Sequence, residues 1–176
     1  MNRCLILFFL FFCSQTSAQN SWDPKVEKTK PKLPQFTASI DTLVCNNQAL
    51  KGKTVYINFW YAACSPCIAE LDALNTMYKK LEGTKNFEFI SFTSDSSNVI
   101  EMLIDKYKIK YPVFFMPKDD LKKMNQGKGF PSSMVVDTYG NIVFTKLGGN
   151  SDKKEARKII MGEIYPAILK ILSIAK

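Results

Sequence analysis

The chain has 176 residues, a formal net charge of +8 and no histidine, and its length allows one domain with a sizeable core. Arg3 and Arg157 are the only arginines among its 24 basic residues, and the lysines stand singly or in pairs. Nucleic-acid binders more often use arginine, whose planar fork fits phosphates and base edges. The sequence therefore favours a solvated basic surface and predicts no nucleic-acid partner.

The first 18 residues predict a secretory signal peptide. Arg3 precedes an apolar run over residues 5–12, and residues 16–18 are small, as at a cleavage site. The run is shorter than the roughly 20 residues that span a bilayer. Cys13 follows two phenylalanines, where a lipidation motif usually has small residues, so cleavage after residue 18 is favoured and a lipid anchor at Cys13 is the alternative. We therefore expect an exported protein of the periplasm or cell envelope.

A tether and one folded domain follow the signal peptide. Residues 19–34 are rich in proline and charge, which is typical of an extended tether. In residues 35–176 the apolar periods first predict a β-hairpin over 35–45, a buried strand over 54–60, a helix over 65–81, a strand over 86–92 and a helix over 99–107. An extended segment over 111–115 and a short helix over 119–125 follow. The last predicted elements are hairpin strands over 132–136 and 141–146 and a helix from near residue 151 with a kink at Pro166. Strands that alternate with helices pair in parallel, and the late hairpin adds antiparallel strands, so we expect a mixed α/β sheet.

Two cysteines, Cys64 and Cys67, stand two residues apart in the stretch 58–71, NFWYAACSPCIAEL. A zinc or copper site needs three or four ligands, and the chain offers no histidine and no second cysteine pair, so no metal is expected. A structural disulfide between them would close a very small loop, which stabilises a fold little because the entropic gain grows with loop length. These considerations leave a redox pair as the favoured interpretation.

The local geometry expected around Cys64 supports redox chemistry. Cys64 follows a buried strand and begins a helix, where free amide N–H groups and the helix dipole favour a thiolate. Cys67 lies one turn later and can attack a mixed disulfide formed on Cys64. Removal of the signal peptide leaves Cys45 as the third cysteine. A buried, small apolar role for Cys45 is favoured over a regulatory or intermolecular thiol.

Several motifs together resemble an established fold. They are Trp60, Cys64-Ser65-Pro66-Cys67 and Gly129-Phe130-Pro131-Ser132, which resemble the active site and the cis-proline loop of thioredoxin-fold proteins. From about Gln35 onward, the chain resembles the TlpA/ResA-like family of exported thiol–disulfide oxidoreductases. The resemblance implies a thioredoxin-like three-layer α/β fold, with a mixed central sheet flanked by helices and an N-terminal β-hairpin extension. Two residues depart from thioredoxin itself: Ala63 replaces a tryptophan, and Asn58 replaces a buried aspartate, as in many TlpA-like proteins.

Glu70 and the proline loop supply the other candidate site residues. Glu70 stands three residues beyond Cys67, as the resemblance implies, and residues at that spacing share a helix face. Partial burial would raise the pKa of Glu70 and suit it to accept the Cys67 proton, with a solvated surface glutamate as the alternative. A cis bond before Pro131 would present the Phe130 backbone to an extended client segment. Trp60 would line the same substrate surface, with core packing as the alternative.

The resemblance implies disulfide exchange with other exported proteins, as a reductase, and cytochrome c maturation is a process that many relatives serve. We expect no cofactor, a monomeric protein, and a membrane-bound electron donor as a partner. A client-binding module without turnover is the alternative, which the intact cysteine pair disfavours. A peroxiredoxin-type peroxidase is less favoured, because that group has threonine or serine three residues before its reactive cysteine, where this chain has Tyr61.

Overall fold

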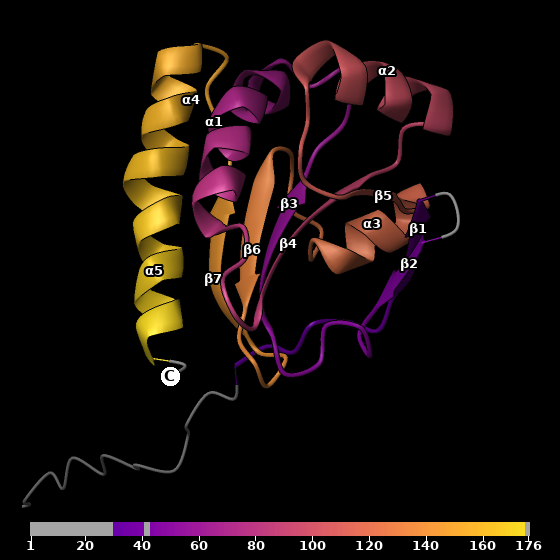
Figure 1. Cartoon of the computed structure of the whole chain (residues 1–176). Helices are drawn as coiled ribbons and strands as arrows, with labels where there is room; N and C mark the ends of the chain where they lie inside the picture. Colours follow the sequence, from indigo (N-terminus) through magenta and orange to yellow (C-terminus); the bar gives the residue numbers. More distant parts are fainter. Residues whose placement is uncertain (1–29, 41–42, 175–176) are drawn as a thin grey trace, which may run out of the picture.

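The computed structural model describes residues 30–40 and 43–174, so the predicted signal peptide, Cys13 and the first part of the tether lie outside the described residues. Within that part of the chain, seven strands form one mixed sheet in the order β2-β1-β5-β4-β3-β6-β7 (Figure 1). The strands are β1 (Thr37–Ile40), β2 (Leu43–Asn46), β3 (Thr54–Phe59), β4 (Phe87–Thr93), β5 (Val113–Phe115), β6 (Ser132–Val136) and β7 (Ile142–Leu147). The helices are α1 (Ser65–Leu81), α2 (Ser97–Tyr107), α3 (Lys118–Met124), α4 (Lys153–Ile159), the π-helical turn η1 (Ile160–Ile164) and α5 (Tyr165–Ile174). None of these helices is both long and apolar enough to cross a membrane.

The strand β3 lies in the interior of the sheet, between β4 and β6, and its sequence explains why. All six of its residues are buried, as expected for a β-branched and aromatic run that is covered on both faces. It pairs in parallel with β4 and antiparallel with β6. The strand β5 continues the parallel part of the sheet, and β1–β2 and β6–β7 form antiparallel hairpins. The predicted mixed sheet and the N-terminal β-hairpin extension are therefore confirmed.

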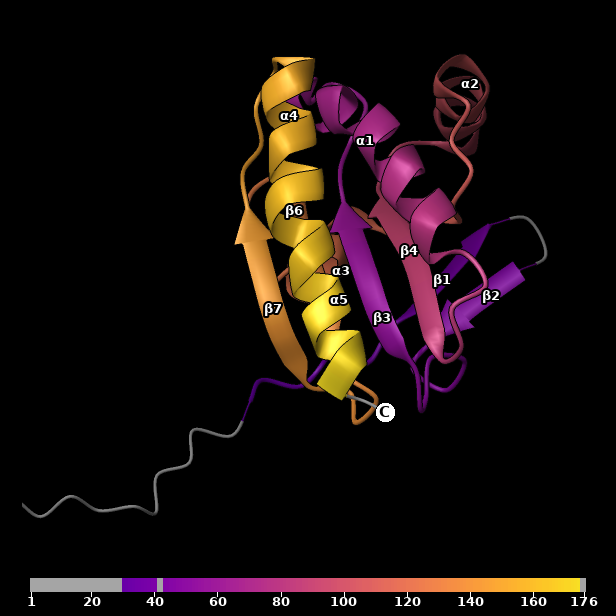
Figure 2. The same ribbon diagram turned by 60° about the vertical axis from the view of Figure 1, so that its left-hand side comes forward.

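Helices cover both faces of the sheet and complete three layers. Figure 2 shows α1, α4 and α5 in front of the sheet and α3 behind it. On the front face, Tyr56 of β3 belongs to one apolar cluster with Leu74 of α1 and Ile164 of η1. On the opposite face, Ile57 of β3 belongs to a second cluster with Leu121 of α3. This is the thioredoxin-like arrangement that the resemblance implied.

The folded domain begins earlier than residue 35, because the last part of the predicted tether pairs with the turn between β6 and β7. The amide N–H of Ile142 donates to the Pro31 carbonyl at 2.7 Å. The amide N–H of Leu33 donates to the Gly140 carbonyl at 3.0 Å. The Leu33 side chain is buried in the α3-side cluster, which is a contact that composition alone does not indicate.

Pro166 is the second residue of α5, and α5 continues directly from η1 (Figure 1). A π-helical turn, η1, lies directly before α5, and the kink at Pro166 stays a prediction. Proline lacks an amide N–H, and its ring crowds the carbonyl four residues earlier. A π-type turn widens the helix locally, which accommodates both effects at this place.

Candidate active site

The cysteine pair lies at the junction between β3 and α1. Cys64 is the N-cap residue of α1, and Pro66 occupies its first turn, where the missing amide N–H leaves no hydrogen bond unmade. Cys64 and Cys67 form a disulfide with their Cα atoms 5.2 Å apart. The Cys67 amide N–H donates to the Cys64 sulfur at 3.2 Å. Cys64 is 5% exposed and Cys67 1% exposed, so the two cysteines differ mainly in the place of Cys64 at the helix end.

Asp95, in the loop after β4, holds the segment that leads into Cys64. Its carboxylate accepts a hydrogen bond from the Ala62 amide N–H at 2.7 Å. The same oxygen, Oδ2, accepts the Thr93 hydroxyl at 2.7 Å. Asp95 is not among the site residues predicted from the sequence. The signal that could have found it is its place after a parallel strand next to β3, because the carboxyl ends of such strands meet at one edge of the sheet.

Glu70 lies on the buried face of α1, where it is 2% exposed. Burial raises the pKa of its carboxyl group from 4.5 to about 8. A surface glutamate, the alternative interpretation from the sequence, is therefore not what the structure shows. A group with a pKa near the working pH can both accept and donate a proton, and Cys67 is the thiol one turn before it on the same face.

Pro131 and Phe130 lie in the loop that enters β6. The Phe130–Pro131 peptide bond is cis, as predicted. The Pro131 carbonyl accepts the Gly148 amide N–H at 2.9 Å. The ring of Phe130 contacts the ring of Tyr61 edge-on, with centroids 5.2 Å apart. Tyr61 directly follows Trp60 and precedes the cysteine pair by three residues, so the proline loop and the cysteine loop meet through these two rings.

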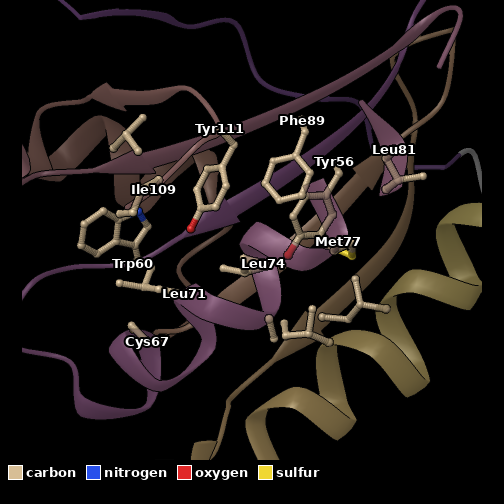
Figure 3. Packing of buried hydrophobic residues seen from close by; sticks show 14 of the residues in the cluster. Tyr56, Trp60, Cys67, Leu71, Leu74, Met77, Leu81, Phe89, Ile109 and Tyr111 are labelled. Atoms are coloured by element: carbon tan, nitrogen blue, oxygen red, sulfur yellow. The ribbon is translucent and has the colours of Figure 1, made fainter. Parts of the chain in front are cut away.

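Trp60 lies in the core below the site and not at its surface. It is 1% exposed, and its indole N–H donates to the Ser91 hydroxyl at 2.7 Å. Figure 3 shows Trp60 and Cys67 on the same side of the sheet, with Leu71 nearby. A direct contact between Trp60 and a client is not consistent with this burial. The packing role that the sequence left open is the one that fits.

A row of polar residues crosses the three central strands under α1. Asn58 of β3 pairs in register with Ser91 of β4 on one side and with Ser133 of β6 on the other. The Ser133 hydroxyl is hydrogen-bonded to the Tyr56 hydroxyl at 2.8 Å. Among the described residues, neither end of the buried Asn58 amide has a hydrogen-bond partner. The three strands thus carry a row of buried polar side chains on the α1 side of the sheet.

The described residues contain no group of three or more His, Cys, Asp or Glu side chains that are placed to hold a metal ion. A disulfide at the start of a helix, a cis-proline loop beside it and a buried carboxyl group one turn further on define a thioredoxin-like dithiol site.

Comparisons with known proteins agree with this site. The redoxin family profile matches residues 28–160. The thiol-disulfide oxidoreductase ResA of Bacillus thuringiensis subsp. konkukian is 26% identical over 162 residues, which cover 90% of this chain and 92% of that protein. The solution structure of a thiol:disulfide interchange protein from Bacteroides sp. is 26% identical, with a TM-score of 0.64, and the match covers 82% of this chain and 90% of that one. The crystal structure of StoA from Bacillus subtilis, which is 21% identical, has the same fold, with a TM-score of 0.58 and coverage of 73% and 96%.

The fold and the site thus define a thioredoxin-like thiol–disulfide oxidoreductase. The chain belongs to the redoxin family, because the family profile matches most of its length. The family and the enzyme class predicted from the sequence are confirmed.

Proposed function

We propose that the protein is an exported reductase that exchanges disulfides with other exported proteins through Cys64 and Cys67. The observation that carries this proposal is the place of Cys64 at the N-terminus of α1, where its sulfur accepts the Cys67 amide N–H. In the reduced protein this amide and the helix dipole stabilise a Cys64 thiolate. A thiolate is the form of cysteine that attacks a disulfide.

The exchange proceeds in two steps. The Cys64 thiolate attacks one sulfur of a client disulfide, so the client's S–S bond breaks, a Cys64–client bond forms, and a client thiolate leaves. Cys67 then gives its proton to the Glu70 carboxylate and attacks the Cys64 sulfur, which releases the second client thiolate. The client gains two electrons, and the enzyme ends with the Cys64–Cys67 disulfide seen in the structure.

Glu70 returns its proton in the reverse half of the cycle. When a thiolate of the electron donor attacks Cys64 in the oxidised protein, Cys67 leaves and takes the proton from Glu70. With a pKa of about 8, the Glu70 carboxyl group is largely protonated near neutral pH in the oxidised form, so it holds the proton that this step needs. One proton thus moves between Glu70 and Cys67 in each half of the cycle.

Phe130 and Pro131 form the client side of the site in this proposal. The backbone of Phe130 pairs with an extended client segment as a short added strand. The rings of Phe130 and Tyr61 give that segment an apolar contact beside Cys64. Trp60 supports this surface from the core, through its bond to Ser91.

The proposal also covers the export of the protein and its role in cytochrome c maturation. Export is supported by the signal-peptide pattern of residues 1–18, and it would place the protein in the periplasm or cell envelope. There a membrane-bound electron donor would keep the cysteine pair reduced. The haem-attachment cysteines of apocytochrome c are the client class that we propose, and the names of the relatives, which state only thiol–disulfide exchange, are consistent with it.

A trapping experiment tests the clients. Cys67→Ser removes the resolving thiol, so a mixed disulfide between Cys64 and its client should accumulate in the cells that produce the protein. We expect non-reducing gels and mass spectrometry to identify exported proteins with cysteine pairs, including apocytochrome c. The matched control, Cys64→Ser with Cys67→Ser, should capture nothing. Capture of cytoplasmic proteins alone would contradict export, and capture of exported proteins without apocytochrome c would contradict the cytochrome assignment.

A further inference from the structure

Gly149 lies in the loop between β7 and α4, directly against two residues of the proposed site. A Cβ atom placed on Gly149 would lie 2.5 Å from Oε1 of Glu70 and 2.7 Å from Cγ of Pro131. Both distances are shorter than real Cβ contacts, which essentially never fall below 3.0 Å. The carboxylate oxygen and the proline ring atom are therefore no more than about 5.2 Å apart, the sum of these two distances.

The backbone conformation of Gly149 does not by itself require glycine. Its neighbour Gly148 has a φ of 81°, which disfavours side chains, whereas Gly149 is not among the residues with positive φ. What Gly149 provides is space on the side that faces α1. The Gly148 amide N–H donates a hydrogen bond to the Pro131 carbonyl at 2.9 Å. This bond fixes the position of the loop next to Pro131.

We infer that Gly149 is a positioning residue: its missing side chain leaves the space in which the Glu70 carboxyl group is held against Pro131 and away from water, one helical turn after Cys67. The inference rests on the role proposed above for Glu70. According to this inference, the loop between β7 and α4, which is far from the cysteines in sequence, shields the Glu70 carboxyl group from solvent. A side chain at position 149 forces the carboxyl group or the proline ring to move.

The surroundings of Glu70 explain why shielding by this loop affects the pKa of its carboxyl group. Burial is the cause of its raised pKa. The titratable groups that face it are Tyr56 of β3 and Tyr111 before β5, whose own pKa values are raised by burial and by the Glu70 charge, and Cys67 once the disulfide is reduced. The loop contributes the backbone of Gly149, and the segment before β6 contributes the Pro131 ring, so neither adds a charge. Water that enters beside Gly149 would therefore lower the pKa of Glu70 toward its ordinary value.

The test compares Gly149→Ala with Gly162→Ala. Gly162 lies in η1, it has no positive φ, and a Cβ there meets nothing within 4 Å, so the same substitution has no clash. Carbon-13 NMR of the Glu70 side-chain carboxyl in the oxidised protein reports its protonation directly, without turnover. We expect a midpoint near 8 in the wild type and in Gly162→Ala, and a midpoint at least about one pH unit lower in Gly149→Ala.

Kinetics of the resolving step give a second readout. The reduced protein, with Cys45→Ala to remove the third thiol, is mixed with an aromatic disulfide whose released thiolate absorbs visible light. The first burst reports attack by Cys64, and the second reports attack by Cys67. Gly149→Ala should slow the second phase roughly 10-fold, as expected for a misplaced catalytic group, and should shift its pH profile in the direction of the NMR midpoint. The first phase should change less than about twofold.

The outcomes separate this inference from the proposed function. An unchanged Glu70 midpoint in Gly149→Ala would overturn the positioning role of Gly149, whatever the kinetics show. A Glu70→Gln variant whose second phase matches the wild type would overturn the proposed role of Glu70, while the NMR comparison would still decide the role of Gly149. A lowered midpoint together with a shifted second phase supports both.

Discussion

The two faces of the interior strand β3 carry different kinds of residue. Toward α3 the strand presents Val55, Ile57 and Phe59, whose side chains contain no polar atom. Toward α1 it presents Tyr56 and Asn58, and Trp60 follows directly after its last residue. Tyr56 and Trp60 are each hydrogen-bonded to a serine of a neighbouring strand. The first face contributes burial alone, which any apolar residue of the right shape can supply. The second face joins the core to the redox site, so its residues affect both stability and chemistry.

The largest effect is expected from the apolar face. Ile57 is fully buried, and Ile57→Ala should lower the free energy of unfolding by about 2–5 kcal/mol, because it leaves a cavity that the core fills only in part. Urea denaturation of the oxidised protein measures this. The rate constant of disulfide exchange per folded molecule should stay within about twofold of the wild type. A much slower exchange would show that the α3 face also shapes the site.

The second largest effect is expected for the rate of disulfide exchange when Glu70, on the α1 side of the sheet, is replaced. Glu70→Gln keeps the shape but removes the proton acceptor, so the resolving step should slow about 10- to 100-fold. The rate of the wild type should rise as the pH approaches about 8, the pKa of Glu70, and Glu70→Gln should lose this rise. Single-turnover kinetics between pH 6 and pH 9 measure it. Identical pH profiles for the two proteins would return Glu70 to a purely structural role.

The same substitution has a stability signature with a definite sign. The folded-state pKa of Glu70, about 8, is higher than the ordinary 4.5, so the folded protein binds this proton more tightly than the unfolded chain does. The resulting stabilisation is complete below pH 4.5 and is lost as the pH rises to about 8. Glu70→Gln in the oxidised protein should remove this part of the decline, which denaturation at several pH values detects.

The smallest effect is expected from the hydrogen bonds of the polar face. Tyr56→Phe leaves the buried Ser133 hydroxyl without its partner, which should cost about 1–3 kcal/mol of stability. Tyr56→Phe with Ser133→Ala should cost less than the sum of the single changes, because both partners are then apolar. If the two single losses of stability add up to the loss in the double variant, the hydrogen bond between Tyr56 and Ser133 contributes nothing to stability. The two faces of β3 would then differ only in composition.

Local sequence signals predicted the elements that carry the cysteines. The helix over residues 65–81 was placed with the bounds that α1 has, because its apolar spacing and the proline in its first turn are local features. Cys64, Cys67 and Glu70 were found for the same reason, since all three lie on or next to that helix. The strand before them was predicted to include Trp60, and β3 ends one residue earlier.

The residues that sequence reasoning missed reach the site from distant parts of the chain. Ser133 lies 77 residues from Tyr56, and Asp95 lies 33 residues from Ala62. Their contacts arise only when the sheet assembles, so no period or motif marks Ser133, and the only signal for Asp95 is its place after a parallel strand. Gly149 is even harder to predict from the sequence, because what it contributes is the absence of a side chain beside Glu70. The pairing of Pro31 and Leu33 with the β6–β7 turn was missed for the same reason.

The burial of Cys45 has a consequence for fidelity. Cys45 lies in the α3-side cluster, whereas Cys64 and Cys67 lie in the α1-side cluster, so the sheet separates the odd thiol from the reactive pair. Burial also raises the pKa of Cys45 to about 11, which keeps it protonated and unreactive at neutral pH. In the folded domain the sheet therefore keeps Cys45 apart from the cysteine pair, so among the three cysteines of the described residues a wrong pairing with Cys45 is expected only before the strands have assembled.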